Sequence, residues 1–280
     1  AATGTGVDRW ATMDDGVRLH YVERGEGPLV VLLHGFPQYW GAWRRQVPAL
    51  VAAGFRVVVP DLRGYNLSDR PLAAHAYDVT RLAWDVAQLV EAVGATRAHV
   101  VGHDWGGAIA WAVAARHPGR VERLAILNAP HPSAYVRALT TTTQPLRSWY
   151  VAFFQLPWLP EALLGAFDSA LLARVLRHGP ARPGAFADEE IGRHRAAWRR
   201  PGALKAGVDY YRALLRAEGR EGRRTARRSA QVLAPTLVLW GMRDRYLHPS
   251  LCEGLERWVP DVRVVRFPEA SHWLMEDEPD

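Results

Sequence analysis

The sequence GHDWGG, at residues 102–107, directly follows the apolar run HVV at residues 99–101. Its glycines, Gly102, Gly106 and Gly107, allow a strand to turn sharply into a helix while the residue between them stays exposed. That residue, Asp104, is predicted to be a nucleophile, because a carboxylate that displaces oxygen or halogen from carbon leaves an ester that water can cleave. A serine would leave an ether instead. The alternative is an ordinary turn in which Asp104 caps the following helix.

Runs of leucine and β-branched residues alternate with segments of helical periodicity and predict an α/β fold, with a mostly parallel twisted sheet flanked by helices on both faces. The predicted strands lie within residues 28–35, 55–64, 99–107, 123–130, 235–244 and 262–273. Residues 77–94 have helical spacing and end at Gly94, a typical helix stop. Residues 17–25 alternate with period two and predict an exposed antiparallel hairpin at the sheet edge.

The strand pattern disappears between about residues 139 and 225 and resumes at Pro235. The intervening segment is rich in aromatic residues, arginine and helix formers. An insertion into an otherwise continuous sheet pattern predicts a mostly helical cap that is joined to the sheet at both ends. The chain is therefore divided into a first core segment (1–138), the cap (139–225) and a second core segment (226–280).

Two further polar residues follow predicted strands and complete a catalytic set with Asp104. Asp244 follows PTLVLWGMR and His272 follows FPEAS, in the chain order nucleophile, acid, histidine. Because ligands bind beyond the carboxyl ends of parallel strands, these side chains are expected to meet. His272 would take a proton from water, and Asp244 would fix its tautomer and stabilise the imidazolium.

The motif HGFP, at residues 34–37, is predicted to supply an oxyanion hole. The backbone N–H groups of Phe36 and Trp105 are expected to meet the negative charge that develops when water attacks the Asp104 ester. His34 is interpreted as a structural hydrogen-bonding residue, and Pro37 as a candidate for a cis peptide bond.

Other polar residues at the strand ends are given structural roles. Asn128 carries no charge, so the acid role is assigned to Asp244 alone. Asp61 and Asp69 are interpreted as loop and capping residues, and Asp61 is expected to pair with Arg63, two residues away.

Length and composition allow one large core with an inserted cap, since 49% of the 280 residues are hydrophobic. The single cysteine, Cys252, is interpreted as an inert thiol. The longest apolar segment, residues 149–167, is cut by two prolines, and the N-terminus lacks an apolar targeting region. A cytoplasmic protein without a membrane span is therefore expected.

The formal charge of +6 comes almost entirely from arginine, and the densest run lies between Arg216 and Arg228. Acidic residues interrupt this run and no aromatic residues are interleaved for base stacking, so a solvated linker or helix face is predicted instead of a nucleic-acid site. No cluster of cysteine and histidine ligands is apparent, so neither a metal nor an organic cofactor is expected.

The chain resembles the epoxide hydrolases of the α/β-hydrolase fold. The resemblance rests on HGFPQYWGAWRRQ, DLRGYNLSDRP, GHDWGGAIAW, FFQLPWLPE and the SHW around His272, which stand in family order over nearly the whole chain. It implies that two cap tyrosines hold and protonate the epoxide oxygen, and Tyr150 and Tyr211 are their matches by position; Tyr210 is the alternative to Tyr211. Substrate contacts are expected from Trp105, Trp149, Phe153 and Phe154.

Haloalkane and haloacid dehalogenases use the same nucleophile and are the first alternative. The former commonly carry asparagine where this chain has Phe36, and fluoroacetate dehalogenases place arginines where it has Trp105 and Ala108. A neutral epoxide therefore fits better than a carboxylated halide. A non-catalytic ligand-binding protein of this fold is the second alternative, although it has no need of the complete set of Asp104, Asp244 and His272.

Two expectations concern the ends and partners of the chain. Relatives usually continue into a final helix that packs on the sheet, whereas this sequence stops eight residues after His272. The expected partners are an epoxide and water, and the sequence leaves open whether the chain also forms a homodimer through its cap.

Overall fold

The computed structural model describes residues 7–216 and 231–280. Within these residues an eight-stranded sheet has the order β1-β2-β4-β3-β5-β6-β7-β8. Strands β3–β8 run parallel, and β2 pairs antiparallel with both of its neighbours, β1 and β4. The strands are β1 (Val7–Thr12), β2 (Arg18–Arg24), β3 (Leu29–Leu33), β4 (Arg56–Pro60), β5 (Ala98–His103), β6 (Val121–Leu127), β7 (Thr236–Gly241) and β8 (Val262–Phe267). The predicted α/β fold is confirmed, and the six strands predicted from apolar runs all form.

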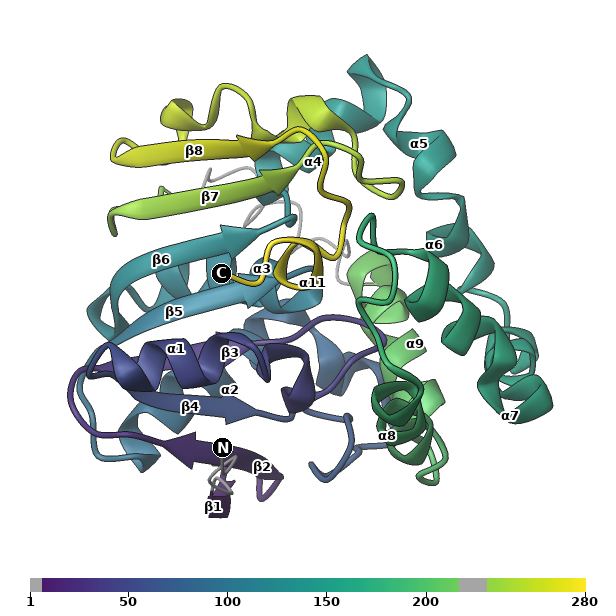
Figure 1. Cartoon of the computed structure of the whole chain (residues 1–280), viewed down its shortest axis with the longest axis horizontal. Coiled ribbons are helices and arrows are strands. Elements are labelled where there is room, and N and C mark those ends of the chain that lie inside the picture. The colour runs from purple at the N-terminus through teal and green to yellow at the C-terminus, as the bar shows by residue number, and fades with distance from the viewer. Residues whose placement is uncertain (1–6, 217–230) are drawn as a thin grey trace.

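Helices α1 (Gln46–Ala52) and α11 (Leu274–Asp277) lie on one face of the sheet, and α2 (Val79–Ala92) and α3 (Trp105–Arg116) on the other (Figure 1). The helix predicted at 77–94 is α2, whose N-terminus is capped by Asp78 and which is followed by Gly94 at φ 80°. Short 3₁₀ helices are η1 (Trp40–Trp43), η2 (Ala74–Tyr77), η3 (Pro118–Arg120), η4 (Pro249–Cys252) and η5 (Leu255–Arg257).

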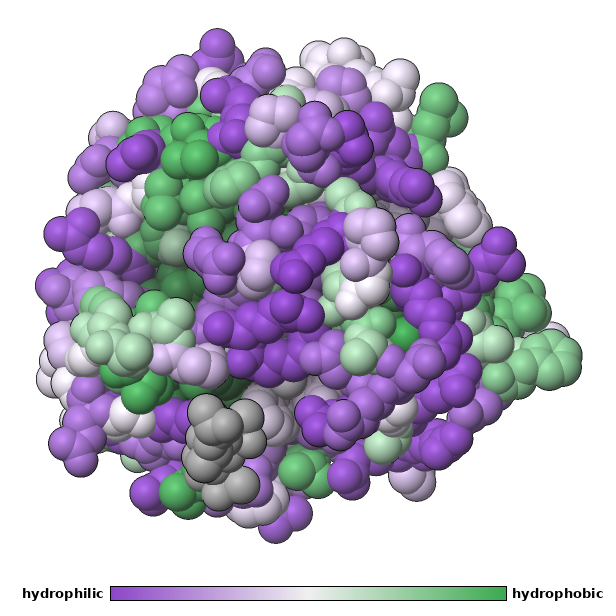
Figure 2. Space-filling model, viewed as in Figure 1, coloured by the Kyte–Doolittle hydropathy of each residue, from purple (hydrophilic) through white to green (hydrophobic). Residues whose placement is uncertain are grey.

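The face that carries α1 is covered only in part by the described residues. Figure 2 shows hydrophobic side chains at the surface over the part of the sheet that holds β6–β8. Val101, Leu239 and Phe267 pack against the core on this side but are only partly buried. Helices lie over both faces, as predicted, and the α2 and α3 face is the more completely covered.

The segment predicted as an exposed edge hairpin does belong to an antiparallel hairpin at the end of the sheet, but it is not the edge strand. Strand β2 pairs with β1 on one side and with β4 on the other, so it is an inner strand and its residues 19–22 are buried. The edge is β1, whose apolar content is too low to predict a strand from alternation alone. Because residues 19–22 point alternately to the two faces of the sheet and are all buried, both faces of β2 are covered there.

Between β6 and β7, the described residues form helices and no strand. Helix α4 (Pro132–Thr141) comes first. The helices of the segment predicted to be the cap are α5 (Gln144–Arg147), α6 (Trp149–Phe153), α7 (Leu159–His178), α8 (Asp188–Trp198) and α9 (Ala203–Arg216). Helix α7 is interrupted at residues 166–169, where the backbone leaves helical geometry. The arrows of the parallel strands point toward the cap helices (Figure 1), so the strand ends face the cap.

The exact division into core and cap stays a prediction. The predicted cap boundary at residue 225 lies outside the described residues. So does the arginine-rich run that follows Arg216, for which a solvated linker or helix face was predicted.

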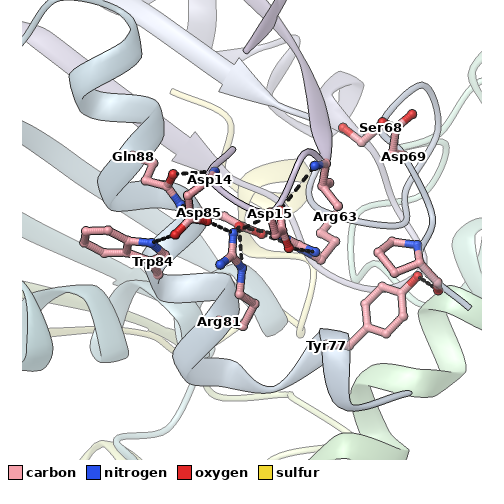
Figure 3. A network of polar contacts seen from close by, with 12 residues as sticks. Asp14, Asp15, Arg63, Ser68, Asp69, Tyr77, Arg81, Trp84, Asp85 and Gln88 are labelled. Atoms are coloured by element: carbon pink, nitrogen blue, oxygen red, sulfur yellow. Dashed lines mark hydrogen bonds and ion pairs between the residues drawn. The ribbon is translucent and has the colours of Figure 1, made fainter. Parts of the chain in front are cut away.

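A buried ion network lies between α2 and the loop after β4 (Figure 3). Arg63 donates two hydrogen bonds of 2.7 Å to Asp85 on α2, and its Nη1 lies 2.8 Å from Asp15. The predicted pair of Asp61 with Arg63 is therefore wrong: Asp61 lies 2.7 Å from Nδ1 of the buried His20 instead. The loop turns between these two residues, so that Asp61 faces β2 whereas Arg63 faces α2.

This network also anchors the cap. The hydroxyl of Tyr210 on α9 donates a 2.7 Å hydrogen bond to the backbone carbonyl of Arg63. Removal of one partner from a buried ion pair costs about 3–5 kcal/mol, so the loop that accepts this bond is held firmly. The tyrosine-bearing helix is thereby fixed against the sheet.

The turn at GHDWGG has the strained geometry that its glycines predict. Asp104 has φ 52° and ψ −122°, a left-handed conformation that side-chain-bearing residues seldom adopt. A Cβ atom added to Gly106 would lie 2.2 Å from the carbonyl oxygen of Leu33, and one added to Gly102 would lie 2.3 Å from that of Gly106. The strand and helix approach so closely here that only glycine fits.

We expect Gly106→Ala to destabilise the protein by about 1–3 kcal/mol, because the added methyl group would collide with backbone atoms that cannot rotate away. Gly119→Ala is the matched control, since a Cβ atom there meets nothing within 4 Å. The free energy of unfolding, measured in denaturant for both variants, checks this. Equal stability of the two variants would contradict the packing described for the turn.

Candidate active site

Three strand ends bring Asp104, Asp244 and His272 together. Nδ1 of His272 lies 2.7 Å from Oδ2 of Asp244, and its Nε2 lies 3.5 Å from Oδ2 of Asp104. The Asp244 side chain is fully buried, whereas that of Asp104 is 19% exposed. The imidazole thus bridges a shielded carboxylate and one that solvent or a ligand can reach.

The buried carboxylate of Asp244 is held by several donors. Its Oδ1 accepts hydrogen bonds from the backbone N–H groups of Tyr246 (2.7 Å) and Leu247 (2.9 Å). Its Oδ2 accepts from the side-chain amide of Asn128 at 2.8 Å, in addition to His272. Asn128, to which the sequence assigned no acid role, therefore orients the acid.

The two carboxylates control the charge of the histidine. Burial opposes protonation of His272, but Asp244 and Asp104 outweigh it and raise its pKa to about 10. Burial likewise opposes ionisation of Asp104, but the hydrogen bond and charge of His272 lower the Asp104 pKa below its usual value. At neutral pH the site therefore holds an ionised Asp104 beside an imidazolium.

Backbone N–H groups converge on the same carboxylate from the other side. Phe36 donates a 2.8 Å hydrogen bond to Oδ1 of Asp104, and the N–H of Trp105 contributes to lowering the Asp104 pKa. The Phe36–Pro37 peptide bond is cis, as predicted. His34 accepts a hydrogen bond from the N–H of Leu62 at 3.1 Å, which is the structural role expected for it.

Two cap tyrosines lie over this carboxylate. The rings of Tyr150 on α6 and Tyr211 on α9 are 5.7 Å apart, and Tyr211 also packs on Trp105 (5.1 Å) and Phe36 (5.7 Å). Burial, reinforced by the charge of Asp104, raises the pKa of both tyrosines well above the usual value. Both hydroxyls are therefore held as neutral donors. The alternative, Tyr210, uses its hydroxyl to anchor α9.

The three aromatic residues of α6 and its C-terminus that were predicted to contact the substrate differ in how deeply they are buried. Phe154 is buried, with its ring 4.9 Å from Tyr211 and 5.8 Å from Tyr150. Phe153 is partly buried beside Phe154. Trp149 is 66% exposed, so it lies at the outer side of this aromatic cluster.

Two residues near His272 escaped the sequence analysis. His103 is fully buried, and its Nε2 lies 2.8 Å from the backbone carbonyl of His272, with burial lowering its pKa to about 4. Tyr246 packs its ring 5.1 Å from that of His272 and 5.9 Å from that of Tyr150. In the sequence, only their closeness to Asp104 and Asp244 could have indicated that these two residues lie in the site.

No group of three or more His, Cys, Asp or Glu side chains suited to a metal ion is found among residues 7–216 and 231–280. Within the same residues, no helix is both long and apolar enough to cross a membrane. The lone cysteine, Cys252, is free and buried.

Comparisons with known proteins agree with this fold. The sequence profile of the α/β hydrolase fold family matches residues 28–279. The chain is 40% identical over 269 residues to the AB hydrolase superfamily protein YfhM of Bacillus subtilis (strain 168), covering 95% of this chain and 91% of the relative. It is 34% identical over 275 residues to human epoxide hydrolase 4, covering 95% and 74%.

Among solved structures, that of a Bacillus megaterium epoxide hydrolase in complex with an inhibitor superposes with a TM-score of 0.88 at 31% identity, covering 97% of this chain and 95% of that one. The chain therefore belongs to the α/β-hydrolase fold family. Within it, the predicted resemblance to the epoxide hydrolases is confirmed, and the protein is a hydrolytic enzyme.

We expect the imidazole of His272 to titrate near pH 10 in the unmodified enzyme. Asp244→Asn should lower this pKa by more than one unit, because it removes one of the two negative charges that favour the imidazolium. Histidine NMR titration of both proteins is the measurement. A His272 pKa near 6.5 in both would contradict the charge distribution described here.

Proposed function

We propose that this enzyme hydrolyses an epoxide to a vicinal diol through a covalent hydroxyalkyl ester on Asp104. The single observation that carries the proposal is the placement of an ionised Asp104 between His272, two backbone donors and a pair of neutral tyrosines. A nucleophile, an acid for the leaving oxygen and a base for water are all needed, and each has a candidate within this site. The epoxide hydrolases to which the chain is similar support the same reaction.

In the first step, Asp104 attacks an epoxide carbon and the C–O bond of the ring breaks. Oδ2 is the attacking oxygen, because Oδ1 is engaged by the N–H of Phe36. The ring oxygen leaves as an alkoxide and takes a proton from Tyr150 or Tyr211, whose hydroxyls stabilise the charge as it appears.

Esterification then changes the protonation of His272. Because Asp104 becomes neutral, one of the two carboxylates that raise the His272 pKa is lost, and the imidazolium gives up its proton. The proton released by His272 restores the hydroxyl of the tyrosine that protonated the alkoxide. The first step therefore creates the neutral base that the second step requires.

In the second step, neutral His272 takes a proton from water, and the resulting hydroxide attacks the ester carbonyl. The carbonyl oxygen is Oδ1, so the N–H groups of Phe36 and Trp105 meet the oxyanion. Collapse breaks the acyl C–O bond, and the leaving alkoxide takes the proton of the newly formed carboxyl group and departs as the diol. Asp104 is then ionised and His272 protonated, as at the start. Asp244 keeps its charge throughout and stabilises the imidazolium.

Product analysis on a substrate panel tests the reaction class. The purified enzyme is incubated with aryl and alkyl epoxides, and diol formation is followed alongside halide release from haloalkanes and fluoroacetate. Diol formation without halide release supports the proposal. Halide release without diol formation would overturn it in favour of a dehalogenase.

We expect His272→Ala to accumulate the ester, because its formation does not need the imidazole as a base whereas its hydrolysis does. Intact-protein mass spectrometry should show a mass increase equal to that of the epoxide. The double variant Asp104→Ala/His272→Ala is the control and should stay unmodified. An unmodified single variant after prolonged incubation would count against the covalent scheme.

Replacement of Tyr150 or Tyr211 by phenylalanine should slow ring opening on the order of a hundredfold, since each removes one donor to the leaving oxygen. The double variant should be nearly inactive. Single-turnover kinetics of ester formation is the measurement. Tyr21→Phe is the matched control, because Tyr21 is buried on β2, outside the helices that carry Tyr150 and Tyr211, and it should leave the rate of ring opening within a few-fold. Full activity of the double variant would show that other groups protonate the oxygen.

A further inference from the structure

The two tyrosines that are proposed to hold the epoxide oxygen stand on different helices. Tyr150 belongs to α6, which has only five residues, whereas Tyr211 belongs to α9, which Tyr210 anchors to the loop after β4. A helix as short as α6 does not keep its shape without contacts to the rest of the chain. The separation of the two hydroxyls therefore depends on what joins α6 to α9.

Arg212, the residue after Tyr211, makes this connection. Its side chain is only 8% exposed. Its Nε donates a 3.0 Å hydrogen bond to the backbone carbonyl of Phe154, and its Nη2 donates a 2.7 Å hydrogen bond to that of Leu156. The N–H of Phe154 in turn donates to the carbonyl of Tyr150 at 2.9 Å. One guanidinium thus links the residue beside Tyr211 to the turn that starts at Tyr150.

Two carboxylates hold this guanidinium in place. Glu161 on α7 accepts hydrogen bonds from both Nη atoms, at 2.5 Å and 3.1 Å, and Asp209 on α9 accepts one from Nη1 at 3.1 Å. Together with the carbonyl contacts, these bonds are as many as the N–H groups of a guanidinium, whose planar fork fixes their directions. A lysine at position 212 would keep the charge but could not make all of these bonds.

Gln155 provides a second link at the same place. Its Nε2 donates to the backbone carbonyl of Val151 at 2.9 Å and to that of Tyr211 at 3.1 Å. One amide group is therefore shared between α6 and α9. Arg212 reaches from α9 to the end of α6, and Gln155 reaches from the end of α6 back to α9.

We propose that Arg212 is a positioning residue that sets the separation of the Tyr150 and Tyr211 hydroxyls. The inference rests on the proposed function, in which these hydroxyls donate to the oxygen of the opening ring. The guanidinium is engaged by carbonyl and carboxylate oxygens, so it acts on the reaction through the tyrosines. Hydrolysis of the ester relies on His272 and backbone N–H groups instead. Loss of the fork should therefore slow the first step and spare the second.

The test measures both steps in Arg212→Lys, which keeps a positive charge beside Glu161 and Asp209 and so limits the loss of stability. Rapid-quench mass spectrometry follows the rise and decay of the Asp104 ester in a single turnover. We expect ester formation to slow about tenfold, because displaced donors stabilise the leaving oxygen less, and ester hydrolysis to change by less than about twofold. A smaller folded fraction would lower the amplitude of ester formation and not its rate.

Arg199→Lys is the matched control. Arg199 binds Asp168 through two hydrogen bonds of 2.7 Å and 2.6 Å, but this pair joins the end of α8 to α7 instead of α6 to α9. Both rates should stay unchanged in this variant. Gln155→Leu removes the second link without touching the buried ion pair, and it should slow ester formation about threefold.

A double-mutant cycle separates positioning from general damage. In Tyr211→Phe only Tyr150 remains as a donor, so the separation of two hydroxyls no longer matters. In that background Arg212→Lys should slow ester formation by less than about threefold, against about tenfold when both tyrosines are present.

Three results would overturn this inference and leave epoxide hydrolysis intact: equal slowing by Arg212→Lys in both backgrounds, an equal fall in the rates of ester formation and ester hydrolysis, or no change in either rate. If the unmodified enzyme formed no diol from the epoxide panel, the proposed function would fall and the inference with it.

Discussion

The strained backbone at Asp104 is the constraint on which the site depends. Its positive φ directs the carboxylate out of the turn between β5 and α3, toward the N–H of Phe36 and the imidazole of His272. This conformation is unfavourable in isolation and persists because the surrounding packing leaves no alternative. Gly102 and Gly106 permit that packing, since a side chain at either position would meet backbone atoms. Strain and close packing at one turn thus place the proposed nucleophile.

The electrostatic arrangement follows from this placement. Two carboxylates on either side of His272 keep it protonated, and the imidazolium in turn keeps Asp104 ionised despite partial burial. Loss of the Asp104 charge would shift the imidazole toward its neutral form. The same pair of residues can therefore favour attack by the carboxylate first and activation of water afterwards, with no change in backbone geometry.

The parallel strands and the three polar residues at their ends were predictable from the sequence, because each is indicated by a pattern within a short stretch of the chain. Apolar runs placed the parallel strands, and polar residues after those runs placed Asp104, Asp244 and His272. The predictions that were wrong concern partners far apart in sequence. Arg63 pairs with Asp85 on α2 instead of its neighbour Asp61, and β2 pairs with a strand on each side, which the spacing of its apolar residues does not reveal. The contacts of His103 and Tyr246 with His272 likewise depend on how distant loops meet.

The central claim is that carbon becomes bonded to Asp104 before water enters the reaction. A single turnover in oxygen-18 water, with enzyme in excess over epoxide, tests it most directly. Covalent catalysis at Asp104 predicts an unlabelled diol and oxygen-18 in the peptide that contains Asp104, because water attacks the ester carbonyl and not the substrate carbon. Label in the diol of the first turnover, with none in that peptide, would show that water attacks the epoxide itself and would contradict the proposed mechanism.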